Sequence, residues 1–266
     1  MRQLEAKTVV VVGGTTGLGL SAAKAFVAEG ARVVVVGRSA ESAQAALGIL
    51  GSSGRAHVGD ASDPATAIAA IKLAHEAFGG FDGLYHVAGG SGRKFGDGPL
   101  HEITDEGWDY TLRLNLTSLM YSNRAAICDF LARKVGGTIL NMGSVLGWSP
   151  SPDFFATHAY AATKSAVIGF TRSAASYYAR ANIRLNVLAP ALVGTPMAQR
   201  AAKDAAIAEF IKTKQPLAGG RIGQPDDLDG AAIYFLSDAS RFTTGQVLSV
   251  DGGWDISEGQ TPNFKS

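Results

Sequence analysis

Tyr160 and Lys164 lie four residues apart in the sequence. At this spacing, two side chains share one face of a helix. A tyrosine hydroxyl titrates near ~10, too high for easy proton exchange at neutral pH, and a fixed positive neighbour lowers that pKa by stabilising the phenolate. The pair could therefore serve as a general acid and base. The same spacing also arises by chance in many helices, so its meaning depends on the elements that position the pair.

Length and charge bound the class of protein. The chain has 266 residues, which one doubly wound α/β domain can hold. Its 24 basic and 23 acidic residues give a net charge of +1, which favours neither nucleic acid nor an anionic membrane as a partner. Residues 1–7 lead into an apolar run without a signal peptide, and no apolar run reaches membrane-spanning length. We therefore expect a cytoplasmic protein that contacts no membrane.

Cys128 is the single cysteine of the chain, which rules out an internal disulfide framework. It lies in an apolar stretch with a helical pattern. We expect a buried, structural thiol at this position.

Seven short apolar runs alternate with longer alanine-rich segments. The runs are residues 8–12, 32–36, a weaker run ending at 57–58, 84–87, 138–141, 183–188 and 247–250. Strands that are continuously apolar are buried on both faces, which indicates a parallel sheet with helices on each side. The sequence therefore predicts a single-domain, Rossmann-type, doubly wound α/β fold with a mainly parallel seven-stranded sheet.

Local signals mark the starts of several helices. Pro64, Pro196 and Pro225 each lie near the start of a helical segment, where proline is tolerated. Thr104 is followed by two acidic residues, which is typical of an N-cap and a first helical turn.

A glycine-rich turn, Gly13-Gly14-Thr15-Thr16-Gly17-Leu18-Gly19, follows the first strand and opens a helix. Glycines at such a turn let a pyrophosphate approach the backbone, and the helix N-terminus offers free N–H groups. A glycine-rich turn without a ligand is the simpler alternative. Its position directly after the first strand favours a dinucleotide site.

The end of the second strand carries Gly37-Arg38-Ser39 and no acidic residue. A carboxylate at this point would bind a ribose 2′-hydroxyl, whereas an arginine suits a 2′-phosphate. We therefore prefer NADP to NAD as the cofactor. The alternative is that Arg38 is a solvated loop residue.

Further motifs follow in a fixed order along the chain. They are Asp60 with Ala61, the segment His86-Val87-Ala88-Gly89, Asn115, Ser144, the Tyr160/Lys164 pair, the segment Pro190 to Thr195 and the strand within residues 244–253. Together with Gly13, Gly17 and Gly19, this order and spacing resemble the short-chain dehydrogenase/reductase family over nearly the whole chain.

The resemblance implies a mechanism and a set of site residues. Tyr160 would exchange a proton with the substrate oxygen during hydride transfer, and Lys164 would lower the tyrosine pKa and hold the nicotinamide ribose. Ser144 would bind the carbonyl oxygen, and Asn115 would hold a water that links Lys164 to solvent. The expected cofactor contacts are Gly13, Thr15, Thr16, Gly17, Leu18, Gly19, Arg38, Ser39, Asp60, Ala61, Ala88, Gly89, Tyr160, Lys164, Pro190, Val193 and Thr195.

The same resemblance implies a domain organisation and an assembly. Residues 1–256 would form one dinucleotide-binding and catalytic domain, followed by a polar tail at 257–266. The family further implies a homotetramer, which nothing else in the sequence indicates.

Three departures from the family pattern bear on the site. His86-Val87 replaces two asparagines, and we expect His86 to be structural rather than catalytic. Val12 and Ala191 replace the common threonine and glycine. The segment 148–155 lengthens the gap between Ser144 and Tyr160, and it is either an exposed or interface loop or part of a substrate wall.

Other functions receive less support. The five histidines are scattered without His-x-x-x-His spacing, so no metal site is expected, and no Gly-x-Ser-x-Gly motif surrounds Ser144. The main alternative is an NADP-binding sensor or scaffold without turnover, since fold does not fix function. The retained acid/base residues disfavour it.

The sequence and the resemblance specify the substrate only as a carbonyl compound or an alcohol. Rim candidates are the segments 90–95, 148–155 and 193–210, and the last follows Thr195 as a predicted helical lid. Trp148, Phe154 and Phe155 favour a bulky apolar ketone. Arg93-Lys94 favours an anionic substrate instead, unless the pair is simply solvated.

Overall fold

The computed structural model describes residues 2–195, 198 and 203–259. Seven parallel strands form one sheet in the order β3-β2-β1-β4-β5-β6-β7. The strands are β1 (Thr8–Val12), β2 (Arg32–Gly37), β3 (Gly54–Val58), β4 (Gly83–His86), β5 (Gly137–Met142), β6 (Ile183–Pro190) and β7 (Val247–Val250). The predicted doubly wound α/β fold is confirmed. β4 begins and ends one residue before the predicted 84–87, and the other strands contain the predicted runs.

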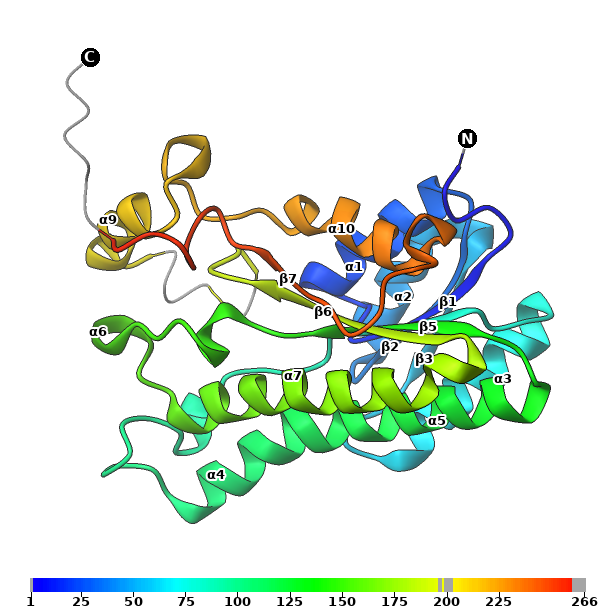
Figure 1. Ribbon diagram of the computed structural model, residues 1–266, viewed down its shortest axis with the longest axis horizontal. Helices are drawn as coiled ribbons and strands as arrows, with labels where there is room; N and C mark the ends of the chain where they lie inside the picture. Colours follow the sequence, from blue (N-terminus) through cyan, green and yellow to red (C-terminus); the bar gives the residue numbers. More distant parts are fainter. Residues whose placement is uncertain (1, 196–197, 199–202, 260–266) are drawn as a thin grey trace.

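Helices cover both faces of this sheet (Figure 1). The helices are α1 (Gly17–Ala28), α2 (Ala40–Leu50), α3 (Pro64–Phe78), α4 (Asp105–Leu112), α5 (Ser118–Arg133), α6 (Pro152–Phe155), α7 (His158–Tyr178), α9 (Ala205–Lys214) and α10 (Asp229–Leu236). The first core cluster joins one face of the sheet to α1, α2 and α10. The second joins the other face to α3, α5 and α7.

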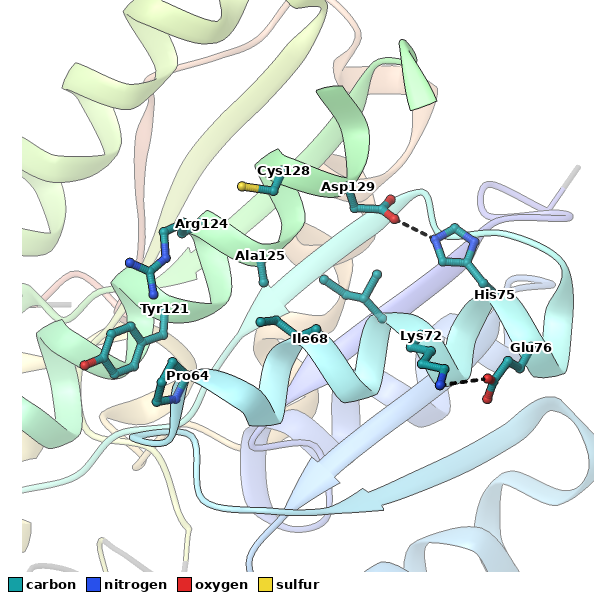
Figure 2. A pocket seen from close by; sticks show the side chains of 11 residues that line it. Pro64, Ile68, Lys72, His75, Glu76, Tyr121, Arg124, Ala125, Cys128 and Asp129 are labelled. Carbon is teal, nitrogen blue, oxygen red and sulfur yellow. Dashed lines mark hydrogen bonds and ion pairs between the residues drawn. The ribbon is translucent and has the colours of Figure 1, made fainter. Parts of the chain in front are cut away.

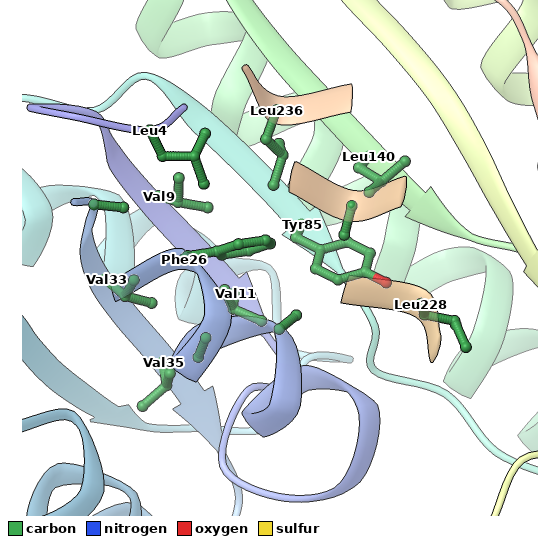
Figure 3. Packing of buried hydrophobic residues seen from close by; sticks show 14 of the residues in the cluster. Leu4, Val9, Val11, Phe26, Val33, Val35, Tyr85, Leu140, Leu228 and Leu236 are labelled. Atoms are coloured by element: carbon green, nitrogen blue, oxygen red, sulfur yellow. The ribbon is translucent and has the colours of Figure 1, made fainter. Parts of the chain in front are cut away.

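Alternating valines explain why the central strands read as unbroken apolar runs. Successive side chains of a strand point to opposite faces of the sheet. Val9, Val11 and Val33 therefore pack with Phe26 on one face (Figure 3). Val10 and Val34 pack on the other. Each buried valine contributes roughly 1.5–3 kcal/mol, so both layers of helices are held by the same strands.

The helix-start signals match the structure where it is described. Pro64 is the first residue of α3, directly after the capping residue Asp63. The Thr104 side chain caps α4 by accepting a hydrogen bond from the Gly107 N–H at 3.0 Å, as predicted. Pro225 begins a 3₁₀ turn, Pro225–Leu228, that leads into α10. Pro196 lies outside the described residues.

A buried pair of amides and a threonine connect three elements of the fold. Asn123 on α5 and Asn141 on β5 exchange hydrogen bonds of 2.8 and 2.9 Å, and Asn141 also donates to the Thr171 hydroxyl on α7 at 3.0 Å. All three side chains are fully buried. Because an unpaired buried polar group costs about 1–3 kcal/mol, sliding any one of these elements would be penalised.

The prediction of a buried Cys128 is wrong, because its thiol is exposed. The neighbours Ala126, Ile127 and Phe130 form the inner face of α5. The helical period turns Cys128 away from that face. It lines a surface groove between α3 and α5 (Figure 2).

The described part of the predicted tail bonds to α9. The Ser257 hydroxyl donates to the Thr213 carbonyl at 2.7 Å, and the Gly259 N–H donates to Ser257 Oγ at 3.2 Å. Residues 260–266 lie outside the described part. Among the described residues, no helix is both long and apolar enough to cross a membrane.

Candidate active site

Parallel strands place all their carboxyl ends at one edge of the sheet, and the predicted site residues follow those ends. The strand order reverses between β1, which leads to β2 and β3, and β4, which leads to β5 and β6. Ligands of open α/β sheets bind at such a reversal. The loops after β1, β4, β5 and β6 therefore enclose the candidate active site.

Two positions after β1, Gly13 and Gly19, have room only for glycine. Gly13 has φ +85°, and a Cβ there would lie 2.6 Å from the Ala88 nitrogen. A Cβ at Gly19 would lie 2.1 Å from the Gly13 carbonyl oxygen. Thr16 precedes α1 without making a side-chain capping bond, so the first-turn N–H groups remain available to an anion. This glycine cradle fits the pyrophosphate of a dinucleotide.

Two further residues after β1, Thr15 and Leu18, pack inward. Thr15 is buried, and its hydroxyl oxygen accepts a hydrogen bond from the Ser42 hydroxyl at 3.1 Å. A Cβ at Gly37 would lie 2.1 Å from Thr15 Oγ1, so the end of β2 needs this glycine. Leu18 packs against the first core cluster.

The ends of β2 and β3 form the second part of the site. Arg38 is exposed. The Ser39 hydroxyl accepts a hydrogen bond from the Ser42 N–H at 3.3 Å and so caps α2. Asp60 accepts a hydrogen bond from the Ser62 N–H at 2.7 Å, beside Ala61.

Two arginines act on Asp60 from different elements. The Ser62 bond holds the pKa of Asp60 below its usual range, and the positive charges of Arg38 and Arg113 act in the same direction. Arg113 begins the π-helical turn Arg113–Thr117 between α4 and α5. The sequence did not single it out, because its neighbours there are apolar and no motif marks it.

Asn115 lies inside that π-helical turn and is fully buried. Its Oδ1 accepts from the Gly90 N–H at 2.9 Å, and its Nδ2 donates to the carbonyls of Gly90 and Thr111, each at 2.9 Å. The side chain therefore fixes the loop after β4 against the helix. Its Oδ1 also lies beside Gly89, where a Cβ would approach it to 2.7 Å.

Lys164 is buried beside the same loop. A Cβ at Gly89 would lie 2.7 Å from Asn115 Oδ1 and 3.7 Å from Lys164 Nζ, so both polar groups face the Gly89 backbone. The ammonium donates to the Met142 carbonyl at 2.9 Å. Burial lowers the pKa of Lys164 to about 8.

Tyr160 and Ser144 complete the cluster. Burial raises the pKa of Tyr160 to about 12, and a hydrogen bond with the Ser144 side chain acts in the opposite direction. Ser144 also caps a 3₁₀ turn by accepting from the Leu146 N–H at 3.3 Å. The Lys164 ammonium lies 5.4 Å from the centroid of the Tyr160 ring.

The expected lowering of the Tyr160 pKa by Lys164 is not what the structure shows. The two side chains do share one face of α7, as predicted. Loss of hydration around the phenol dominates, however, and the ammonium is bonded to the Met142 carbonyl.

His86 replaces an asparagine of the family pattern and forms structural contacts. Its ring nitrogens lie 2.7 Å from the Ser122 hydroxyl and 3.4 Å from the Ser118 hydroxyl. Burial lowers its pKa to about 3, and the charge of Lys164 adds to that effect. The neutral ring therefore joins β4 to α5, which agrees with the structural role expected from the sequence.

The end of β6 and the loop after it contain Pro190, Val193 and Thr195. Pro190 is the last residue of the strand, and Val193 forms a parallel bridge with Gly223. Gln215, which the sequence did not indicate, is buried and holds Leu192 at both backbone groups, with hydrogen bonds of 3.0 and 3.2 Å.

The predicted lid at 193–210 is described only in part. Residues 196–197 and 199–202 lie outside the described residues, and α9 begins at Ala205.

The segment 148–155 packs into an aromatic cluster. Phe154 contacts Phe210 of α9 with ring centroids 5.0 Å apart, and Phe155 contacts Trp254 at 5.8 Å. The Trp148 indole donates to Asp255 at 2.7 Å. The segment therefore joins α9 to the C-terminal region instead of projecting as a free loop.

One buried carboxylate near the site was missed by sequence reasoning. Asp97 accepts hydrogen bonds from the Ala159 and Tyr160 N–H groups, both at 3.0 Å. Its partners lie more than 60 residues away along the chain. No local pattern could have connected them.

Comparison with known proteins defines the class. A family model described as Enoyl-(Acyl carrier protein) reductase matches residues 12–255. A 2,5-dichloro-2,5-cyclohexadiene-1,4-diol dehydrogenase of Sphingobium indicum is 33% identical over 96% of this chain and 99% of its own. A 2-(S)-hydroxypropyl-CoM dehydrogenase of Xanthobacter autotrophicus is 32% identical, covering 94% and 97%.

A solved structure supports the same assignment. A short-chain type dehydrogenase/reductase from Mycobacterium ulcerans superposes with a TM-score of 0.85, at 28% identity, over 95% of this chain and 91% of its own. The chain belongs to the short-chain dehydrogenase/reductase family. It is an oxidoreductase of that family, whose members use NAD or NADP.

The buried ammonium of Lys164 predicts a measurable pH effect. An unfolded lysine keeps a pKa near ~10.4, so the unfolded state binds more protons between about pH 8 and pH 10, and stability rises with pH through this window. At pH values below that window the wild type buries a charged ammonium, and Lys164→Met removes this charge. The substitution also leaves the Met142 carbonyl without its hydrogen-bond donor. We expect the free energy of unfolding to rise by about 2 kcal/mol near pH 7.

Urea unfolding at about pH 7 and about pH 10 checks this expectation, and the gain should shrink at the higher pH. The exposed Lys94 supplies the control, since Lys94→Met should change stability little at either pH. A lower stability of Lys164→Met than of the wild type near pH 7 would contradict the account.

Proposed function

We propose that this oxidoreductase interconverts a carbonyl and a secondary alcohol by hydride transfer, with NADP(H) as its cofactor and Tyr160 as the general acid and base. The observation that carries the proposal is the convergence of Tyr160, Ser144, Lys164 and Asn115 at the switch point of the sheet. Residues 1–256 serve as one cofactor-binding and catalytic unit.

Each residue of the cluster has a role that its contacts support. A bound nicotinamide dinucleotide supplies or accepts the hydride. Tyr160 gives its phenolic proton to the substrate oxygen in reduction and takes it back in oxidation. Ser144, already bonded to the phenol, donates to the same substrate oxygen and stabilises its developing charge.

Lys164 and Asn115 act on the cofactor side of Tyr160. The ammonium of Lys164 faces the Gly89 backbone, where it can hold the nicotinamide ribose. A pKa of about 8 leaves this ammonium able to exchange protons near neutral pH. Asn115 fixes the Gly90 backbone and holds a water that passes protons between Lys164 and solvent.

Relatives support the reaction class. The relatives reported above are named as dehydrogenases of a diol and of a hydroxypropyl compound. A carbonyl and alcohol pair is therefore favoured over binding of the cofactor without turnover. The aromatic segment 148–155 and the exposed Arg93 and Lys94 remain the candidates for the substrate rim.

A second prediction concerns Tyr160 itself. Tyr160→Phe should keep NADPH binding, because the ring remains, but should lower kcat by roughly 10²–10⁴-fold, since the proton donor is lost. NADPH oxidation against a panel of carbonyl compounds measures the change. Tyr177→Phe, at an exposed position of the same helix, is the control and should behave as the wild type. Near-normal turnover of Tyr160→Phe would reject the proposed acid.

The positive charges of two arginines near the ends of β2 and β3 support NADP as the preferred cofactor. Arg38 follows β2, where the adenosine ribose of a dinucleotide lies in this fold, and the segment Gly37-Arg38-Ser39 contains no acidic residue. Arg113 adds a second positive charge near Asp60. A preference for NADP favours reduction as the direction in the cell.

We expect Arg38→Asp to swing the ratio of NADPH to NADH efficiency toward NADH by about 10–100-fold, the value of a lost charge-assisted contact. Steady-state kinetics with both cofactors measure this ratio. Arg241→Asp changes the same charge at the opposite edge of the sheet and should leave the ratio unaltered. An unchanged ratio in Arg38→Asp would count against NADP recognition by this residue.

We also propose a cytoplasmic homotetramer. Among the described residues, the outer surfaces expose large apolar side chains that other copies would cover, including Leu131 on α5 and Leu248 on β7. Sedimentation velocity should give four times the mass of one chain. A species with the mass of a single chain at micromolar concentration would reject this assembly.

A further inference from the structure

The first turn of α7 draws its hydrogen-bond acceptors from a distant segment. The first N–H groups of a helix have no partner within it. Here the His158 N–H donates to the Gly98 carbonyl at 3.3 Å. The Ala159 and Tyr160 N–H groups donate to the two carboxylate oxygens of Asp97, both at 3.0 Å. Two consecutive residues therefore satisfy three donors at the start of the helix that carries Tyr160.

The N-cap residue of a helix normally accepts a hydrogen bond from these N–H groups, but the N-cap residue of α7 does not. Thr157 occupies the N-cap position, but its side chain makes no capping bond, and its hydroxyl lies 3.4 Å from the Phe155 carbonyl. The first turn of α7 also contains no acidic residue. Asp97 thus supplies both the acceptors of an N-cap and the negative charge that a helix N-terminus favours.

Asp97 is itself held tightly against α4. It is 4% exposed and follows Gly96, which has φ +102°. A Cβ at Gly96 would lie 2.3 Å from Thr104 Oγ1, so the backbone is pressed against the capping residue of α4. Phe95 stacks on Tyr110 of the same helix, with ring centroids 3.8 Å apart. The carboxylate therefore has a fixed position.

This arrangement links the two halves of the site. One half follows α4, which continues into the π-helical turn that contains Asn115. The other half lies on α7, whose first turn contains Tyr160. The bond to the Tyr160 N–H reaches the backbone of the reacting residue directly.

We propose that Asp97 is a positioning residue, whose carboxylate fixes the first turn of α7 and thereby the place of the Tyr160 hydroxyl beside Ser144. This inference rests on the proposed function, in which Tyr160 transfers the proton. Displacing a reacting group by about 1 Å can cost on the order of 100-fold in rate. Asp97 touches neither substrate nor cofactor in this role.

The test uses Asp97→Asn, which keeps the size of the side chain but replaces one acceptor oxygen by a donor group. We expect kcat to fall by about 10-fold or more. The KM for the carbonyl substrate and the Kd for NADPH should stay within about two-fold, because the binding surfaces are unaltered. Asp238→Asn, which removes an exposed acidic residue from the first turn of the 3₁₀ helix Asp238–Ser240 at the amino ends of the strands, is the matched control.

A second measurement needs no turnover. The chain has seven tyrosines, and labelling with meta-fluorotyrosine gives each its own fluorine resonance, with Tyr160 assigned by its absence in Tyr160→Phe. In folded Asp97→Asn, the Tyr160 resonance should shift or broaden while those of distant tyrosines stay in place. A role in stability alone would lower the unfolding midpoint without moving this resonance.

The outcomes separate the two proposals. An inactive wild type, or a Tyr160→Phe variant as active as the wild type, would reject the proposed function, and the fluorine spectrum alone would then decide the inference. Unchanged kcat and an unchanged Tyr160 resonance in Asp97→Asn would overturn the positioning role. A loss of kcat accompanied by an equal rise in KM would also overturn it, since it would indicate contact with substrate. If Asp97→Asn does not fold, Asp97→Ser offers a smaller acceptor for the same measurements.

Discussion

The cost of burying a polar group without a partner governs how this site is built. Asn115, Lys164 and Asp97 are each almost fully buried, and each is bonded to main-chain atoms of another element. An unsatisfied group in such a place costs about 1–3 kcal/mol, and more if it is charged. Any movement that separates these elements therefore breaks several bonds together, so the constraint keeps the reacting groups in register.

The same constraint extends below the site. The reciprocal amides of Asn123 and Asn141 connect α5 to β5, and Thr171 adds α7. These three elements lead to Asn115, Ser144 and Tyr160. The neutral ring of His86 joins β4 to α5 in a similar way. These buried hydrogen bonds thus hold the elements in fixed positions, while burial of the apolar side chains on both faces of the sheet supplies most of the stability.

The sequence predicted features that repeat or that follow a strand directly. Continuous valine runs predicted the buried parallel strands, and the glycines after β1 predicted a turn that the Gly13–Ala88 contact requires. Contacts between short segments that are far apart in the sequence produce no such repeat, which is why Asp97 and Gln215 were missed. Cys128 was misplaced because composition does not show which side of α5 faces solvent. The Tyr160 pKa was misjudged because spacing along a helix does not reveal burial.

Hydride transfer from NADPH to a substrate carbonyl beside this cluster is the central claim, and isotope transfer tests it most directly. NADPH carrying deuterium at the reactive nicotinamide carbon would be incubated with the protein and carbonyl compounds, and the alcohols analysed by mass spectrometry. The account predicts an alcohol with one deuterium on the carbinol carbon, formed at a rate that is proportional to the protein concentration. Stoichiometric NADPH binding with no deuterated alcohol from any compound would contradict it.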